Sequence, residues 1–314
     1  MSPSPRDRDP LDRFTDAMTV GGFRTGAAVA RLLPGFVAEG LATPIGFGAS
    51  FANAERRAMI ERHLKRVNPH WGQFRLRQAV QDAFDSYARY WIEALRLPSL
   101  SDRAVERGFD QDGYYPNVGG AFAQGKGVIL ALPHLGGWEW AGRWLSIQGH
   151  GITVVVEQLE PPELFDWFTR LRRDLGMNVV PAGPGAGSAV VKALRENHAV
   201  CLLSDRDITG GGVEVEFFGE TTTLPAGPAT LSLRTGAPIV PVGVYFTSRL
   251  HGHLAVCRPA LDTTRRGGLR DDVARVTQAL ARELERLIRR APEQWHLFQP
   301  NWPSDPGYQP RPAR

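Results

Sequence analysis

From about residue 115, short apolar runs alternate with segments of helical pattern, and this alternation constrains the fold more than any other feature. Gly127–Leu132 (GVILAL) has the composition of a strand buried on both faces. Strands are also expected at 152–156, 178–181, 199–203, 213–218, 239–246 and 254–257, and helices at 138–148, 163–175, 188–197, 226–235 and 270–290. This order predicts an α/β fold with a mixed central sheet flanked by helices.

The N-terminal third has a helical rather than an alternating strand-and-helix pattern, and it is expected to be helical. Residues 55–67 and 74–97 have the apolar spacing of amphipathic helices. No break in composition separates this third from the rest of the chain. We therefore expect one domain over 11–305, with an N-terminal helical part (11–100) and an α/β part (115–305). The Pro- and Arg-rich ends, 1–10 and 306–314, are expected to be disordered.

Residues 20–54 form a weakly polar, Gly-rich stretch that allows two interpretations. Arg24, Pro34 and Glu39 interrupt it, so it is not an apolar span of the roughly 20 residues that cross a bilayer. It could lie in a membrane interface as amphipathic helices, or it could form a pair of core helices. The start of the chain lacks the charged-then-apolar order of a signal peptide.

Charge and cysteine content narrow the class of partner. The net charge is +4, and Lys65, Lys126 and Lys192 are the only lysines among 37 basic residues. Arginine binds phosphate bidentately, so an anionic partner is expected, although a GC-rich genome also produces this bias. Cys201 and Cys257 lie in apolar runs without CxxC spacing, which indicates two buried thiols and no cysteine metal site.

The strongest candidate site is PHLGGWEW at residues 133–140. His134 follows a buried strand directly, at the strand end where α/β sheets place their ligands. Glu139 lies in the first turn of the next helix. A histidine base needs a carboxylate on its other ring nitrogen, and the turn between them can bring these two side chains together. Without that pairing, they are an ordinary strand-end histidine and a helix N-terminal glutamate.

This segment resembles the His-x4-Asp/Glu motif of the glycerolipid and lipid A acyltransferases. The resemblance extends from the FDSYARYWIEALRLP helix to PEQWHLFQPNW. It is strongest to the branch that contains the lipid A lauroyl acyltransferases and the phosphatidylinositol mannoside acyltransferases. The stretches VVVEQLEP, CLLSDRD and GVEVEFFGE resemble the mannoside acyltransferases most closely. Glu139 stands where the wider glycerolipid family usually has aspartate.

The resemblance implies a glycerolipid acyltransferase-like fold and a single-base mechanism without a covalent intermediate. His134 would take the proton from an acceptor hydroxyl, which attacks an acyl thioester. Acyl-CoA is the implied co-substrate, with no cofactor and no metal. The implied acceptor is an anionic glycolipid, acylated on a mannose hydroxyl at the cytoplasmic face of the inner membrane by a peripheral enzyme. Nucleic acid is not an implied partner. A lipid A-type enzyme that uses acyl carrier protein is the nearest alternative.

Further site residues come from three other segments. Asp205 and Arg206 follow a strand, and Arg206 is expected to bind an anionic head group with Asp205 orienting it. The resemblance implies that Glu214 or Glu216 completes a charge relay with His134, and spacing does not choose between them. It also implies that Arg172 lines the cleft, paired with an upstream acid such as Glu157. The alternative for each is a solvated pair or an exposed face.

Two motifs suggest other classes of protein. GPGAGS at 183–188 imitates the turn of a dinucleotide-binding protein and would make the chain an NAD(P)-dependent oxidoreductase. Ser188 in place of the third glycine, and Pro184 within the turn, weaken that interpretation. His251 and His253 lack nearby acidic or cysteine residues in the sequence, so a surface turn is expected rather than a metal site. A non-catalytic membrane-binding protein on the same fold is a third alternative.

Overall fold

The computed structural model describes residues 10–157, 161–183, 185–208 and 210–309, and their side chains from Gly21 onward. Most of the residues expected to be disordered, 1–9 and 310–314, are outside the described residues. Pro10 begins the first helix, and residues 306–307 form a turn after Asp305, where the Tyr308 N–H donates to the Asp305 carbonyl at 3.1 Å.

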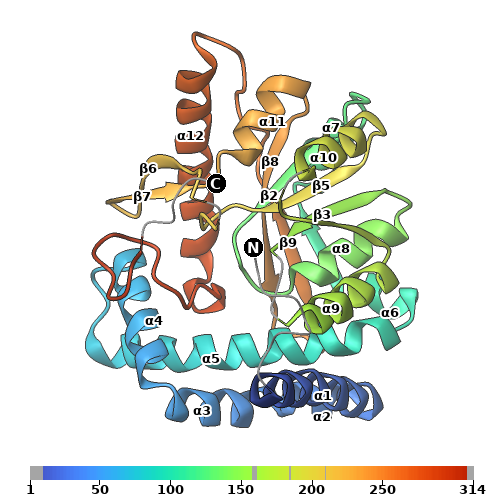
Figure 1. Ribbon diagram of the computed structural model, residues 1–314, viewed down its shortest axis with the longest axis vertical. Coiled ribbons are helices and arrows are strands. Elements are labelled where there is room, and N and C mark those ends of the chain that lie inside the picture. The colour runs from blue at the N-terminus through green and yellow to red at the C-terminus, as the bar shows by residue number, and fades with distance from the viewer. Residues whose placement is uncertain (1–9, 158–160, 184, 209, 310–314) are drawn as a thin grey trace.

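A seven-stranded sheet forms the centre of the molecule, in the order β1-β9-β8-β2-β5-β3-β4 (Figure 1). Its strands are β1 (Phe109–Asp112), β2 (Val128–Leu132), β3 (Ile152–Val156), β4 (Met177–Pro181), β5 (Ala199–Leu203), β8 (Ile239–Phe246) and β9 (His253–Cys257). Strands β8, β2, β5, β3 and β4 are parallel, whereas β9 is antiparallel to β8. The expected mixed sheet flanked by helices is confirmed.

Helices cover both faces of this sheet and form a separate layer below it (Figure 1). The longer helices are α1 (Pro10–Leu32), α3 (Ala42–Ala52), α4 (Ala54–Val67), α5 (Gln73–Arg96), α8 (Trp138–Ile147), α9 (Pro162–Asp174), α10 (Ala186–Arg195), α11 (Gly227–Thr235) and α12 (Leu269–Arg290). The shorter ones are α2 (Gly35–Gly40), α6 (Asp102–Arg107), α7 (Gly120–Phe122) and a π-helix at Tyr114–Gly119. Residues of α8 and α9 share one core with the sheet, and residues of α10, α11 and α12 share the other.

Strand β2 is the rigid support for the residues that follow it. Val128, Leu130 and Leu132 pack into one core, and Ile129 and Ala131 pack into the other. Each side chain of this strand is at most 7% exposed. Burial on both faces explains why the strand reads as a continuous apolar run rather than an alternating one.

Two strands do not follow from the apolar pattern. β1 (FDQD) is a polar edge strand beside β9. β7 (Glu220–Leu224, ETTTL) pairs with β6 (Val213–Phe217) in a separate antiparallel hairpin, and β6 packs on α12. Neither sequence has the apolar alternation that marks a half-buried strand, because an edge position and a hairpin partner tolerate polar side chains.

Helix α5 joins the N-terminal helices to the α/β part. It contacts α1, α3 and α4 on one side and the segment around residues 292–294 on the other. Small buried side chains, among them Ala27, Ala30 and Ala38, allow the N-terminal layer to approach closely. This layer therefore packs on the rest of the molecule while one side of it remains open to solvent.

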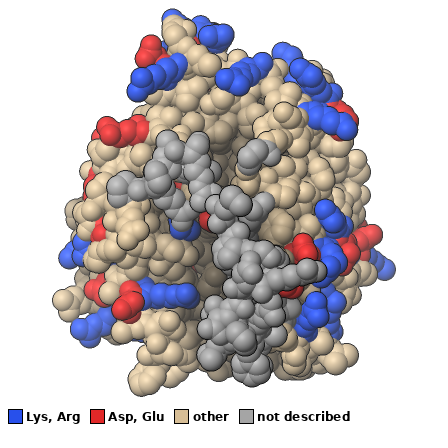
Figure 2. Space-filling model, viewed as in Figure 1, with Lys and Arg blue, Asp and Glu red and all other residues tan. Residues whose placement is uncertain are grey.

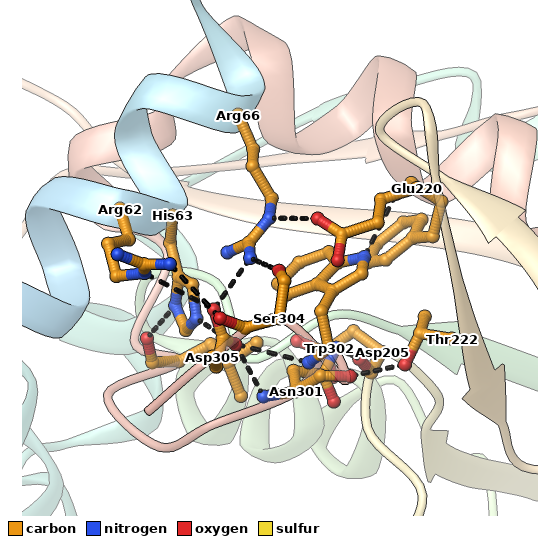
Figure 3. Close-up of polar contacts among 12 residues, drawn as sticks. Arg62, His63, Arg66, Asp205, Glu220, Thr222, Asn301, Trp302, Ser304 and Asp305 are labelled. Carbon is orange, nitrogen blue, oxygen red and sulfur yellow. Dashed lines mark hydrogen bonds and ion pairs between the residues drawn. The ribbon is translucent and has the colours of Figure 1, made fainter. Parts of the chain in front are cut away.

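The C-terminal segment is fixed by a buried cluster around Asp305 (Figure 3). The Asp305 carboxylate is 0% exposed, accepts hydrogen bonds from the Asn301 and Trp302 N–H groups, and lies 3.2 Å from His63 Nε2 and 2.6 Å from Arg66 Nη2. Burial alone would raise the pKa of Asp305, but the hydrogen bonds from His63 and from the backbone hold the pKa well below 3.8. Helix α4 is thereby tied to a loop about 240 residues further along the chain.

Asp305→Ala is expected to lower the free energy of unfolding by about 3–5 kcal/mol, because it leaves buried cationic and donor groups without a partner. Since the pKa of Asp305 is depressed, its stabilisation is present at neutral pH and is lost only as the pH falls through that low value. Urea unfolding at pH 7 measures the effect.

Arg62→Ala is the matched control, because the Arg62 side chain is 47% exposed and lies 3.7 Å from the same carboxylate. It should cost less than about 1 kcal/mol. Equal losses in the two variants would contradict a buried role for Asp305.

Candidate active site

His134 lies at the carboxyl edge of the sheet, two residues after β2 ends. Its imidazole is 34% exposed. The backbone behind it turns sharply at Gly136, which has a φ of +56°, and a Cβ there would collide with the Val244 carbonyl oxygen. Glycine is therefore required at this position by both conformation and space. The turn leaves the imidazole on a fixed backbone with one edge open to substrate.

Asp205 is the carboxylate that holds His134. β5 lies beside β2 in parallel, so the residues after both strands meet at the same sheet edge. Asp205 Oδ1 lies 2.7 Å from His134 Nδ1, while Oδ2 accepts from the His134 N–H at 3.0 Å and from Trp295 Nε1 at 2.7 Å. A carboxylate only accepts, so Nδ1 carries the hydrogen and Nε2 presents its lone pair to the opening.

The electrostatics of this pair favour a charged imidazolium when a proton arrives. Burial alone would lower the pKa of His134, but the charge and hydrogen bond of Asp205 outweigh it, and the pKa is raised above 6.5. Burial would raise the pKa of Asp205, but His134 and Trp295 hold that pKa below 3.8. The pair can therefore accept a proton at Nε2 and stabilise the resulting charge.

The expectation that Glu139 pairs with His134 is wrong. Helix α8 begins at Trp138 and directs Glu139 toward α5 and α9. There Glu139 accepts from the Tyr90 hydroxyl at 2.7 Å and from Arg172 Nη2 at 3.1 Å. It is 3% exposed, and burial raises its pKa despite Arg172. Glu139 therefore connects α8 with α5 and α9 beside His134, instead of orienting the imidazole.

The expectation that Glu214 or Glu216 reaches His134 is also wrong. In β6 the side chains of Val215 and Phe217 point into the core, so the alternating glutamates point outward and are exposed. Glu216 pairs with Arg282 of α12 at 2.8 Å. The hairpin thus places both carboxylates on a solvated face, which is the alternative that the spacing left open.

The remaining expected residues lie at or near the same sheet edge. Arg172 contacts Glu139, and its guanidinium lies over the Trp138 ring, with 5.2 Å to the centroid. Arg206 is half-buried next to Asp205, and its charge acts to lower the pKa of His134. It lines a polar cavity of about 350 Å³ with Asp207 and residues of the C-terminal segment. Glu157 is exposed just beyond the end of β3.

The expectation of a surface turn holds for His251, which lies in the turn before β9, but is wrong for His253, which begins β9 and is buried. His253 is 0% exposed, lies 2.7 Å from a carboxylate oxygen of Glu93 and stacks on the Trp140 ring at 4.2 Å. His251 is 2.8 Å from Glu39. These acids lie far away in sequence, on α5 and α2, which is why the local pattern did not reveal them. Within the described ranges, no group of three or more His, Cys, Asp or Glu side chains is arranged to hold a metal ion.

Neither cysteine is placed as a nucleophile. Cys257 is buried and Cys201 is partly buried. Burial raises the pKa of each thiol to about 12, so both are protonated at neutral pH.

The C-terminal segment supplies site residues that sequence reasoning missed. Trp295 donates to the Asp205 carboxylate, and Asn301 Nδ2 donates to the Asp205 carbonyl at 3.2 Å. The His296 N–H donates to the His134 carbonyl at 2.7 Å, and burial lowers the pKa of the His296 ring to about 3. Nothing in the sequence PEQWHLFQPNW indicates contact with Asp205, because that contact joins residues 90 or more positions apart.

Asp205→Asn is expected to lower the pKa of His134, because the anion that favours the imidazolium is removed. An NMR titration of the imidazole measures this pKa directly. Glu216→Gln is the matched control, since Glu216 is exposed and pairs with Arg282, and it should leave the titration unchanged. An unchanged pKa in Asp205→Asn would contradict the assignment of the pair.

Comparisons with known proteins agree with this geometry. A phosphatidylinositol mannoside acyltransferase of Mycobacterium tuberculosis is 37% identical over 309 residues, covering 95% of this chain and 93% of the relative. One of Mycolicibacterium smegmatis is 35% identical, covering 90% and 91%. A lipid A biosynthesis acyltransferase of Haemophilus influenzae is 22% identical over 244 residues, covering 77% and 74%.

The model of the family described as bacterial lipid A biosynthesis acyltransferase matches residues 18–304. That match includes GPGAGS, and the relatives named above are all acyltransferases, so the comparisons give no support to a dinucleotide-binding oxidoreductase. This chain belongs to the bacterial lipid A biosynthesis acyltransferase family.

Proposed function

We propose that this acyltransferase moves a fatty acyl chain from acyl-CoA to a mannose hydroxyl of a phosphatidylinositol mannoside. The observation that carries the proposal is the His134–Asp205 pair, with Nε2 open at the sheet edge of a chain whose relatives are named for that acceptor. Such a pair supplies one general base.

One base is enough for both proton transfers of this reaction. His134 Nε2 takes the proton of the acceptor hydroxyl as its oxygen attacks the thioester carbonyl. The C–O bond forms, the C–S bond breaks, and the imidazolium returns the proton to the leaving thiolate. The products are an ester and CoA. Asp205 stabilises the imidazolium between these two steps.

The oxyanion formed at the carbonyl needs a hydrogen-bond donor close to His134. The Gly136 N–H is already used, because it donates to the Gln294 carbonyl at 3.0 Å. We assign the role to the Gly137 N–H, at the start of α8.

A small apolar cavity beside the base supports a fatty donor. It has a volume of about 50 Å³, and Leu132, Trp138 and Cys201 are among its lining residues. It lies between the sheet and α8. Leu132, one of its lining residues, is two residues before His134 and belongs to the core on that face of the sheet. A fatty chain fills more space than this, so donor binding must displace side chains such as Trp138.

The N-terminal helices support attachment to a membrane surface. Apart from Tyr115 and Leu250, the large apolar side chains exposed by the described residues are Val29, Leu32, Phe36, Leu41, Ile45, Phe47, Phe51 and Phe74. All lie on α1–α3, between α2 and α3, or at the start of α5, in the layer at the bottom of Figure 1. Figure 2 shows few charged side chains along that lowest edge.

An exposed apolar layer of this kind suits the interface of a bilayer. No helix within the described residues is long and apolar enough to cross one. We therefore propose peripheral attachment at the cytoplasmic face of the inner membrane, where acyl-CoA is present and the acceptor lipid is held.

His134→Ala is expected to lower acyl transfer by a factor of about 10²–10⁴ while the protein stays folded. Purified protein is incubated with labelled palmitoyl-CoA and membrane lipid extract, and the labelled lipid is identified by mass spectrometry. Palmitoyl-acyl carrier protein as donor tests the alternative. Glu214→Gln, on the solvated hairpin, serves as control and should retain full activity. Undiminished transfer by His134→Ala would overturn the mechanism.

The double variant Phe36→Ser and Phe51→Ser is expected to weaken binding to anionic phospholipid vesicles by at least about tenfold, because two exposed aromatic side chains no longer insert. Vesicle co-sedimentation measures the change. Leu250→Ser, at a residue that is 55% exposed outside the N-terminal layer, should bind as the unaltered protein does. Equal binding by the double variant would place the contact elsewhere.

A further inference from the structure

An apolar groove runs through the N-terminal layer, separate from the cavity beside the sheet. Its volume is about 880 Å³, and its walls are almost entirely apolar. Helices α1, α2 and α3 border it, and α5 forms its floor. The lining residues on α5 are Phe84, Tyr87, Ala88, Trp91, Ile92 and Leu95. These recur at helical spacing, so one continuous stripe of α5 faces the groove.

Glycines on α1 keep the groove open. Gly21, Gly22 and Gly26 line it, and a Cβ added to any of them would meet no other atom within 4 Å. Each glycine costs helix stability relative to alanine, yet none is required here by a close approach of the backbone. The space in front of them is therefore room for another molecule rather than a packing requirement of the fold.

One cation stands on the wall of this groove. Arg56, in the first turn of α4, lines it and is exposed. It forms no ion pair with any side chain that the structure describes. An arginine in this setting is suited to a phosphate group.

The groove approaches the site of reaction at Tyr87. The hydroxyl of Tyr87 lies within electrostatic range of both Arg56 and Glu139: burial raises its pKa, Arg56 opposes the increase and Glu139 adds to it. Glu139 in turn contributes to the raised pKa of His134. Phe298, which also lines the groove, is two residues from His296, whose N–H donates to the His134 carbonyl.

We propose that this groove binds a hydrocarbon chain of the anionic glycolipid acceptor, with the lipid phosphate at Arg56. The proposal rests on the proposed function for the nature of the acceptor. Apolar walls with one cation match a chain that carries a phosphate at its end, and they offer few groups to hydrogen-bond a peptide. The acceptor's sugar would then extend past Tyr87 toward His134.

Photo-crosslinking tests the occupant without any turnover. Phosphatidylinositol with a diazirine in one acyl chain is irradiated with the protein in detergent micelles, and the labelled peptides are mapped by mass spectrometry. We expect labels on residues 21–33 and 84–95. Gly26→Leu, which fills the groove, should reduce this labelling at least tenfold, and Gly22→Leu provides a second variant should the first fail to fold.

Gly48→Leu is the matched control. Gly48 lies on α3, does not line the groove, and also has no atom within 4 Å of an added Cβ. It should label as the unaltered protein does. If Gly26→Leu does not reduce the labelling, the proposal is overturned. If saturating palmitoyl-CoA displaces the label, the proposal is also overturned, because the groove then binds the donor.

Kinetics separate this proposal from the proposed function. Gly26→Leu and Arg56→Gln should each raise the KM for a diacyl phosphatidylinositol mannoside at least tenfold, with kcat unchanged. Both should use its deacylated, water-soluble counterpart as the unaltered protein does. Lys65→Gln, an exposed cation on the same helix, is the control. Equal effects on both acceptors would overturn the groove assignment alone, whereas no transfer to either acceptor by the unaltered protein would overturn the proposed function.

Discussion

The carboxylate of Asp205 is the group on which the arrangement of the active site depends. It is fully buried, and it accepts hydrogen bonds from the His134 ring, the His134 backbone N–H and the Trp295 indole. A buried charge is stable only when such donors surround it. Those donors come from the residues after β2 and from the C-terminal segment, so two distant parts of the chain must be in place before the imidazole is oriented.

Helix α5 has a comparable role for the residues that surround His134. Tyr90 holds Glu139, and Glu93 holds His253, which stacks on Trp140 of α8. The opposite side of the same helix forms the floor of the apolar groove. One helix therefore connects the surface that we assign to the membrane with the surface that positions the reacting groups. A change in how α1–α3 sit on α5 can reach the active site through these contacts.

The sequence predicts most of the central sheet, because β2, β3, β5 and β8 are apolar runs of strand length. It also places His134 and Asp205 just after strands, but it assigns Asp205 to Arg206, whereas Asp205 in fact holds His134. It does not reveal that the two strands are neighbours, since strand order depends on how the helices cross over the sheet. Glu139 is closer in sequence and is therefore the more obvious partner for His134. The contacts of Trp295, Asn301 and His253 join residues far apart in the chain, and local patterns carry no information about them.

The Asp305 cluster has a consequence for the order in which the protein matures. Trp295 and Asn301 reach Asp205 from the segment that Asp305 ties to His63 and Arg66. Domains form as the chain leaves the ribosome, from the N-terminus onward. The sheet, His134 and helices α1–α3 are all synthesised before residue 295. A nascent chain therefore has the apolar layer that we assign to the membrane before it has residues 295–305, and Asp205 gains the hydrogen bonds of Trp295 and Asn301 only when that segment docks.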